Sequence, residues 1–285
     1  MGKVKADVPE EYVRARAVLL DALTALEPHL DAIVLVGAQA VYLRTGTADL
    51  AVVPTTTDAD IALAPQRLRD EPLLYQAMRA AGFRAGDNPG AWRGPGDVAI
   101  DLMVPEALCG GGGRRGARLP VHGNWAARRT RGLEPAVVDF DHHVLGALDG
   151  TDPRRVRLAV AGPAALLVAK VTKVGERLAT PRRLSPKDGL DVLRLLRATE
   201  GGTLASRLRL LARHAVAGPV TRDAVAMLRA HGQDPDGPLS ALAGKAVSGL
   251  DDVALVAAST AALVRELLDA YDRTAVTAPP SQPAG

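Results

Sequence analysis

The chain has 285 residues, of which 47% are hydrophobic and only 3% aromatic, so we expect a globular protein with an aliphatic core. Its formal charge of +3 favours anionic partners weakly, and a single cysteine, Cys109, excludes an internal disulfide framework and fits a reducing cytoplasm. Since no apolar stretch reaches the roughly 18 residues that a membrane span needs, we expect a cytoplasmic protein that does not enter the membrane.

Helices and strands alternate in the first part of the chain. Apolar residues at helical spacing predict a helix over residues 9–30, and the β-branched run Ile33–Val36 predicts a buried strand that stops at Gly37. The pattern then predicts, in order, a helix over 38–44, a loop over 45–57, a strand over Asp58–Leu63, a helix capped by Asp70 and Pro72 that ends near Gly82, and a strand over 98–104. This alternation is typical of an α/β sheet covered by helices on at least one face.

The remainder of the chain has a different character. A glycine-rich segment follows Cys109 and predicts a mobile loop, either a plain surface linker or a loop that contacts substrate. From Gly162 onward, alanine- and leucine-rich stretches separated by Gly and Pro predict a bundle of helices. We therefore expect a first domain over residues 1–150, a helical domain over 151–275 and a disordered tail over 276–285.

Three aspartates lie on two of the predicted strands. Asp58 and Asp60 are two residues apart, so on a strand both side chains leave the same face. Asp101 interrupts an otherwise apolar strand, where an unpaired charge would be costly. Any one of them alone is best explained as a turn cap, an arginine partner or a strand-edge residue. Together they predict the carboxylate ligands of two catalytic Mg²⁺ ions, with Asp58 and Asp60 shared and Asp101 also helping to deprotonate an acceptor.

These motifs resemble the polymerase-beta-type nucleotidyltransferase superfamily, which pairs a glycine-containing helix start with an Asp-x-Asp strand and a third carboxylate. The corresponding segments are Val36-Gly37-Ala38-Gln39-Ala40, Thr57-Asp58-Ala59-Asp60-Ile61 and Ile100-Asp101-Leu102. The resemblance implies a catalytic domain of the α+β or α/β class, a mixed sheet with flanking helices, followed by a C-terminal helical bundle that completes the nucleotide site. Ala38 stands where the superfamily has Gly or Ser, so phosphate would be contacted by the backbone N–H groups of Gly37 and Ala38 and not by a hydroxyl.

Spaced motifs over roughly residues 30 to 197 narrow this resemblance to the AbiEii type of bacterial nucleotidyltransferase toxin, which includes the MenT enzymes. The motifs of the second half are Val160-Ala161-Gly162-Pro163 leading to Lys170, then Arg177, then Ser185-Pro186-Lys187-Asp188. Lys170, Lys173 and Arg177 share one helix face, which is ordinarily a solvated face, but the resemblance places it at the nucleotide.

The resemblance also implies nucleotide binding by Lys187 and Asp188. A capping box led by Ser185 explains Asp188 equally well, and Asp191 on the next turn would orient Lys187 or a basic residue of the preceding helix. Arg44, ahead of the acidic pair, is a further candidate for phosphate contact, with an ordinary surface arginine as the alternative.

By this resemblance the chain is an enzyme that binds a nucleoside triphosphate with Mg²⁺ and transfers the nucleoside monophosphate to an acceptor hydroxyl, releasing pyrophosphate. The acceptor would be a tRNA 3′ end, and the protein would be the toxin of a pair with a cognate antitoxin. The arginine clusters at Arg114 and Arg128 would then hold RNA backbone, although a solvated basic loop is an equal explanation of the charge.

Two other functions stay open. One is the same chemistry on a cationic small molecule such as an aminoglycoside, which would need an acidic cleft beside Asp101. The other is a non-catalytic nucleotide-binding module. His122, His142 and His143 lack zinc-like spacing and are assigned no metal, and the glycines after Cys109 lack the Lys-Ser or Lys-Thr of a phosphate-binding P-loop.

Overall fold

A single mixed β-sheet forms the centre of the N-terminal half. The computed structural model describes residues 8–46, 52–110 and 115–273, and the sheet has the order β3-β4-β5-β2-β1-β8-β7, with β6 also beside β5. Its strands are β1 Ile33–Val36, β2 Asp58–Leu63, β3 Arg84–Ala85, β4 Ala91–Arg93, β5 Ala99–Pro105, β6 Arg128–Thr130, β7 Phe140–Gly146 and β8 Arg155–Ala161.

The middle of the sheet consists of strands that the sequence predicts. All of β1 is buried, as its β-branched residues require, and it runs antiparallel to β2 and parallel to β8. β2 in turn runs parallel to β5. Because β1 and β2 are antiparallel, the end of β1 meets the beginning of β2, which brings Val36 opposite Asp60.

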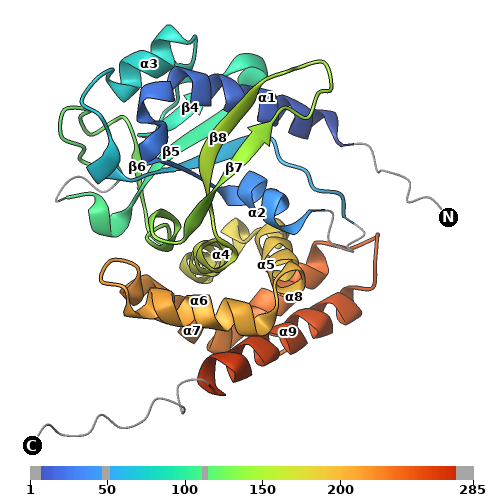
Figure 1. The fold of residues 1–285 in the computed structure, drawn as a ribbon. Helices are drawn as coiled ribbons and strands as arrows, with labels where there is room; N and C mark the ends of the chain where they lie inside the picture. The colour runs from blue at the N-terminus through green and yellow to red at the C-terminus, as the bar shows by residue number, and fades with distance from the viewer. Residues whose placement is uncertain (1–7, 47–51, 111–114, 274–285) are drawn as a thin grey trace, which may run out of the picture.

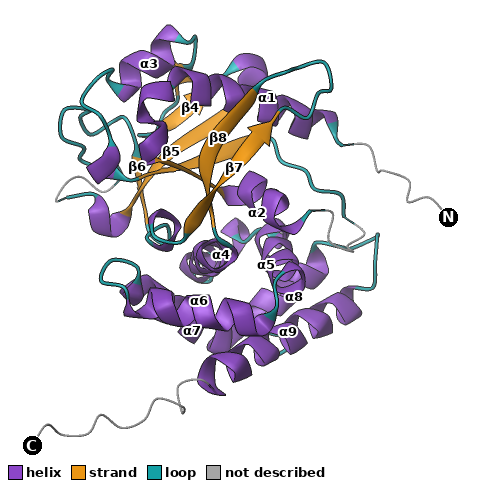
Figure 2. Ribbon diagram, in the orientation of Figure 1, coloured by secondary structure: helices purple, strands orange, loops and turns teal. Residues whose placement is uncertain are grey.

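Helices cover the sheet and then form a separate layer. The helices are α1 Glu10–Ala25, α2 Gly37–Thr45, α3 Leu74–Ala80, α4 Pro163–Arg177, α5 Pro186–Ala198, α6 Gly201–Arg213, α7 Gly218–His231, α8 Pro238–Lys245 and α9 Val253–Arg273. Figure 1 shows α1 and α3 on one side of the sheet and α2, α4 and α5 on the other, with α6 to α9 beyond them. Figure 2 shows the same division between the sheet and the helical C-terminal part. The expected mixed sheet with flanking helices, followed by a helical bundle, is confirmed.

Two predicted helices have different bounds in the structure. The first ends at Ala25, and a 3-10 turn over Glu27–Ala32 follows, because Pro28 has no N–H with which to continue the α-helical hydrogen bonds. The helix expected to be capped by Asp70 and Pro72 begins only at Leu74. Its first N–H donates to His122 Nδ1 at 3.3 Å, so a distant histidine takes the place of the predicted cap.

The sheet continues further along the chain than the sequence suggests. β7 and β8 pair over seven residues each, and residue 150 lies in their connection. The change from sheet to helices therefore comes after Ala161. The predicted tail over 276–285 and residues 111–114 of the glycine-rich segment lie outside the described residues. Within the described part of the chain, none of the helices combines the length and apolar character needed to cross a bilayer.

Candidate functional site

The turn from β1 into α2 brings a glycine against a carboxylate. Gly37 has a φ of +68°, and a Cβ at this position would lie 2.1 Å from Asp60 Oδ2, so both conformation and space require glycine. No side chain caps the start of α2. The Asp60 carboxylate therefore lies beside a helix N-terminus, whose first N–H groups have no partner within the helix and favour negative charge.

The three predicted aspartates lie on neighbouring strands. Asp60 and Asp101 are opposite each other in the parallel register of β2 and β5, and Asp58 is two residues before Asp60 on β2. Side chains that are in register or two apart leave the same face of a sheet. Asp58 is exposed at the start of β2, whereas Asp60 and Asp101 are partly buried.

The ionised form of Asp60 is disfavoured by its surroundings. Burial, together with the nearby carboxylates of Asp58 and Asp101, raises its pKa to about 6, although Lys173 and Lys170 act in the opposite direction. Negative charge is therefore in excess around Asp60, which is the situation that a bound cation relieves.

Asp58 and Asp101 each have another partner. The Thr56 hydroxyl donates to Asp58 Oδ1 at 2.5 Å and accepts from Lys187 Nζ at 3.2 Å, while Arg128 Nη2 donates to Asp101 Oδ2 at 3.0 Å. Within the ranges that the structure describes, no three His, Cys, Asp or Glu side chains are grouped closely enough to hold a metal ion. The predicted three-carboxylate cluster is thus not assembled in this arrangement.

A cavity of about 630 Å³ opens in front of Asp60, and we call it the basic cavity. It lies between the β1–α2 turn, β6 and the flank of α4. Its charged lining comprises seven basic and three acidic side chains: Arg128, Arg129, Arg131, Lys170, Lys173, Arg177 and Arg183, with Asp60, Glu106 and Glu176. Gly37, Met103, Leu133, Leu166 and Ala169 are among its other lining residues. Positive charge therefore predominates around the single strand aspartate that faces the cavity.

The predicted basic row on α4 is confirmed as one face, because Lys170, Lys173 and Arg177 all line the basic cavity. Behind them, α5 supplies two buried carboxylates. Asp188 lies within 3.3 Å of Lys170, 3.0 Å of Lys173 and 3.2 Å of Arg177, and Asp191 lies 2.6 Å from Lys170. The expectation that Asp191 orients a basic residue of the preceding helix is therefore confirmed.

These ion pairs fix the charge states of the buried groups. Burial by itself would lower the pKa of Lys170, but the carboxylates of Asp191 and Asp188 outweigh it and hold the pKa above its ordinary value. Burial would likewise raise the pKa of Asp188, yet Lys170 and Lys173 hold it below its ordinary value. Lys170 is thus a fixed cation in the wall of the basic cavity.

The capping-box interpretation of Asp188 is wrong. Ser185 does occupy the N-cap of α5 and Pro186 follows it, but neither Ser185 nor Asp188 makes a side-chain capping hydrogen bond. Asp188 is only 3% exposed and is occupied by three cations of α4. Lys187 projects toward Thr56 and does not line the basic cavity, and burial lowers its pKa.

The structure does not bring Arg44 to the basic cavity. Its guanidinium donates to the carbonyls of Ala161 and Val160 and pairs with Asp141, and only 11% of the side chain is exposed. Arg44 therefore fastens α2 to β7 and β8, and it is neither a phosphate contact nor an ordinary surface arginine. Ala38 is buried inside α2 and is absent from the cavity lining.

Sequence reasoning does not place β6 or the turn before α5 at the site. The run from Arg128 to Arg131 is predicted to hold RNA backbone, and only its pairing with β5 brings it into the basic cavity. Arg129 pairs with Glu106 at 2.6 Å, and Arg131 pairs with Asp223. The charge run is the available signal, but no local pattern indicates where it lies. Arg114, the other predicted cluster, is outside the described residues.

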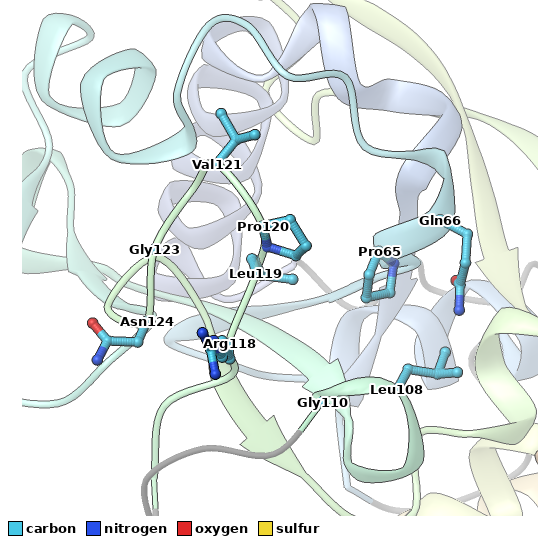
Figure 3. A pocket seen from close by; sticks show the side chains of 10 residues that line it. All are labelled: Pro65, Gln66, Leu108, Gly110, Arg118, Leu119, Pro120, Val121, Gly123 and Asn124. Atoms are coloured by element: carbon cyan, nitrogen blue, oxygen red, sulfur yellow. The ribbon is translucent and has the colours of Figure 1, made fainter.

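A larger cavity, of about 1100 Å³, lies elsewhere, between Pro65 and the turn over residues 118–124 (Figure 3). Arg118 is its only charged side chain within the described residues, and the remaining lining is apolar or neutral. It contains no carboxylate and no group of basic side chains among the residues that the structure describes, and in this it differs from the basic cavity.

Comparisons with known proteins give two distant structural similarities. No protein-family model and no curated protein matches the sequence. The antibiotic-resistance factor ANT(2'')-Ia matches with a TM-score of 0.39 and 13% identity, over 76% of this chain and 96% of that one. An antigenic nucleotidyltransferase-like protein from Paracoccidioides brasiliensis matches with a TM-score of 0.37 and 15% identity, over 76% of this chain and 95% of that one.

Proposed function

We propose that the chain is a nucleotidyltransferase, which transfers a nucleoside monophosphate from a nucleoside triphosphate to an acceptor hydroxyl. One observation carries the proposal. A single cavity joins the uncapped start of α2, the Asp60 carboxylate and seven basic side chains. A triphosphate needs such positive charge, and the helix N-terminus adds backbone N–H groups for phosphate oxygens.

The residues around Asp60 fit Mg²⁺. Carboxylate oxygens are the donors that this ion prefers, and it is commonly held by one or two carboxylates together with phosphate oxygens of the substrate. The raised pKa of Asp60 reflects charge that a cation would neutralise. We assign the ion to Asp60 and Asp58, because Asp101 is paired with Arg128. When bound, Mg²⁺ neutralises charge on the phosphates and on the leaving pyrophosphate.

The basic side chains would divide the work of binding the triphosphate. Lys170 is held in place by Asp188 and Asp191, so it offers a preorganised positive charge. Lys173 is less enclosed, since 44% of its side chain is exposed, and it supplies charge nearer to solvent. Arg183, on the turn before α5, also lines the cavity and makes no ion pair within the described residues.

The proposed reaction exchanges one bond at the α-phosphorus for another. The acceptor oxygen forms a bond to the α-phosphorus, the bond from that phosphorus to the bridging oxygen breaks, and pyrophosphate leaves. Asp101 accepts the proton of the acceptor hydroxyl, since it lies in register with Asp60 and Arg128 orients its carboxylate. Catalysis by this site would be positional and electrostatic.

We propose an RNA acceptor, namely a tRNA 3′ end, and the role of a toxin with a cognate antitoxin, following the motif resemblance to the AbiEii type. The charge beside Asp101 supports an anionic acceptor. Arg128 contacts Asp101 directly, and Arg129 and Arg131 continue the same basic edge. A cationic aminoglycoside would need an acidic cleft at this place, so the small-molecule alternative is less well supported.

Labelled transfer tests the proposal. Purified protein is incubated with each α-³²P-labelled nucleoside triphosphate, Mg²⁺ and total tRNA, comparing wild type with Asp60→Ala and with the exposed control Asp87→Ala. We expect label on tRNA from wild type and Asp87→Ala and none from Asp60→Ala. Equal labelling by all three proteins would refute the role of Asp60. Labelling of an added aminoglycoside with none on tRNA would refute the RNA acceptor and leave the transferase intact.

A further inference from the structure

A third cavity, of about 340 Å³, lies at the opposite end of α2 from the basic cavity. α2 begins at Gly37 in the wall of the basic cavity and ends beside Gly46, which lines this one. We call it the Arg16 cavity, after the one charged side chain among the described residues that line it. The remaining lining includes Leu43, Val52, Val53, Pro54 and Leu148. A volume of this size suits a small organic molecule.

Arg16 is a buried cation without a counter-ion among residues 8–46, 52–110 and 115–273. It is 3% exposed, and its guanidinium donates to three neutral acceptors: Gln39 Oε1 at 2.7 Å, the Gly146 carbonyl at 3.0 Å and the Tyr12 hydroxyl at 3.0 Å. No Asp or Glu of the described chain pairs with it. Burial accordingly lowers its pKa. An unpaired buried charge is costly, and such groups normally have a partner.

The guanidinium retains donors for such a partner. Arginine has five N–H groups, and the three hydrogen bonds use one on Nε, one on Nη1 and one on Nη2. One N–H is left on each terminal nitrogen, and a carboxylate is an acceptor that such charged donors bind strongly. Tyr12 and Tyr42, with ring centroids 5.6 Å apart, form an aromatic wall next to this group.

The mouth of the Arg16 cavity is apolar. Val53 is 38% exposed and Val8 is 44% exposed, and both line the opening. The cavity therefore presents hydrocarbon at its entrance and a single uncompensated positive charge inside. That combination selects an amphiphile with a hydrocarbon body and one negative end.

We propose that the Arg16 cavity binds a small apolar carboxylic acid, with its carboxylate on the Arg16 guanidinium and its hydrocarbon against the aliphatic lining. The site would be regulatory, because Gln39 joins it to the acidic strand: its amide oxygen accepts from Arg16, and its amide nitrogen donates to the Asp58 carbonyl at 3.1 Å. Val52, Val53 and Pro54, which line the cavity, are also separated from Asp58 in the chain only by Thr55, Thr56 and Thr57. Only this regulatory aspect rests on the proposed function; binding does not.

Calorimetry without nucleotide tests binding directly. Octanoate is the probe, and octan-1-ol and octylammonium are the matched neutral and cationic ligands. We expect octanoate to bind at least about tenfold more tightly than octan-1-ol, because the carboxylate compensates the charge of the guanidinium whereas the neutral hydroxyl does not. Octylammonium should not bind. Failure of octanoate to bind, or equal binding of the acid and the alcohol, would overturn the proposal.

Variants of the exposed residue Val53 test where the ligand binds and should not disturb the fold. Val53→Glu adds a negative charge at the opening, and Val53→Gln is its neutral control of the same size. We expect Val53→Glu to weaken octanoate binding roughly fivefold relative to Val53→Gln and to leave octan-1-ol unchanged. Equal affinities of the two variants for octanoate would place it elsewhere and overturn the proposal. Because no nucleotide is present, neither result depends on transferase activity.

Discussion

Replacing Asp60 by asparagine should stabilise the protein in a way that depends on pH. In the folded chain, burial and the carboxylates of Asp58 and Asp101 raise the pKa of Asp60 from 3.8 to about 6. The protonated form is therefore favoured by folding, so its contribution to stability is complete below pH 3.8 and is lost as the pH rises through about 6. The asparagine of the variant carries no charge and loses nothing over this range.

The size of the effect follows from the shift. A shift of about two units corresponds to about 3 kcal/mol between full protonation and full ionisation. Between pH 5 and pH 7, about 1 kcal/mol of that difference develops, so the advantage of Asp60→Asn over wild type should grow by about 1 kcal/mol. Titrating groups distant from Asp60 are shared by the two proteins and cancel in the comparison.

Urea unfolding of both proteins at pH 5 and pH 7, in EDTA, measures this difference. Asp87→Asn, at an exposed position, is the matched control and should show a constant difference from wild type. Adding Mg²⁺ at pH 7 should then stabilise wild type and leave Asp60→Asn unchanged, because ligand binding to the folded state adds to stability. A pH-independent gap between Asp60→Asn and wild type would refute the crowding of negative charge around Asp60.

Three further substitutions separate structure from binding. Gly37→Ala should abolish binding of a nucleoside triphosphate, since its Cβ would meet the Asp60 carboxylate. Gly82→Ala, also at positive φ but in open space, should cost only about 1 kcal/mol of stability. Equal effects of the two substitutions on nucleotide binding and on stability would contradict the close approach of Gly37 to Asp60. Arg44→Ala should lower the free energy of unfolding by about 2–3 kcal/mol in urea and leave nucleotide affinity unchanged, and a selective loss of affinity would restore Arg44 as a phosphate contact. Lys173→Gln should weaken nucleotide binding about tenfold by calorimetry, with little loss of stability. Lys245→Gln on α8 should have no effect on nucleotide binding. Equal nucleotide affinities of the two variants would exclude Lys173 from the site.

The parts of the fold that are predictable from sequence are those with strong local patterns. Ile33–Val36 and Asp58–Leu63 are strands with the predicted bounds, and in Ile33–Val36 the run of buried aliphatic residues permits few alternatives. The two-residue spacing of Asp58 and Asp60 and the helical spacing of the α4 cations correctly indicate which side chains share a face.

The remainder depends on long-range contacts. β3, β4 and β6 have two or three residues each, too few for any periodicity, and their pairing with one another and with β5 alone defines them. β7 is an edge strand in which the polar residues Asp141, His142 and His143 are consecutive, so it lacks the apolar alternation that reveals a strand.

Two side-chain roles differ from the sequence-based interpretation for a similar reason. Arg44 is sequestered by carbonyls more than 100 residues away, and Asp188 by cations of another helix. Local sequence around either residue favours a different partner. Only the packing of α2 and α4 against their neighbours determines where these charges find compensation.

We propose that Asp60 and the basic cavity together hold a nucleoside triphosphate with Mg²⁺. Calorimetric titration with a non-hydrolysable triphosphate analogue, with and without Mg²⁺, tests it in wild type and Asp60→Asn. We expect Mg²⁺ to tighten binding to wild type and to have no effect on the variant. Identical affinities with and without Mg²⁺ in wild type, or equal tightening in both proteins, would contradict it.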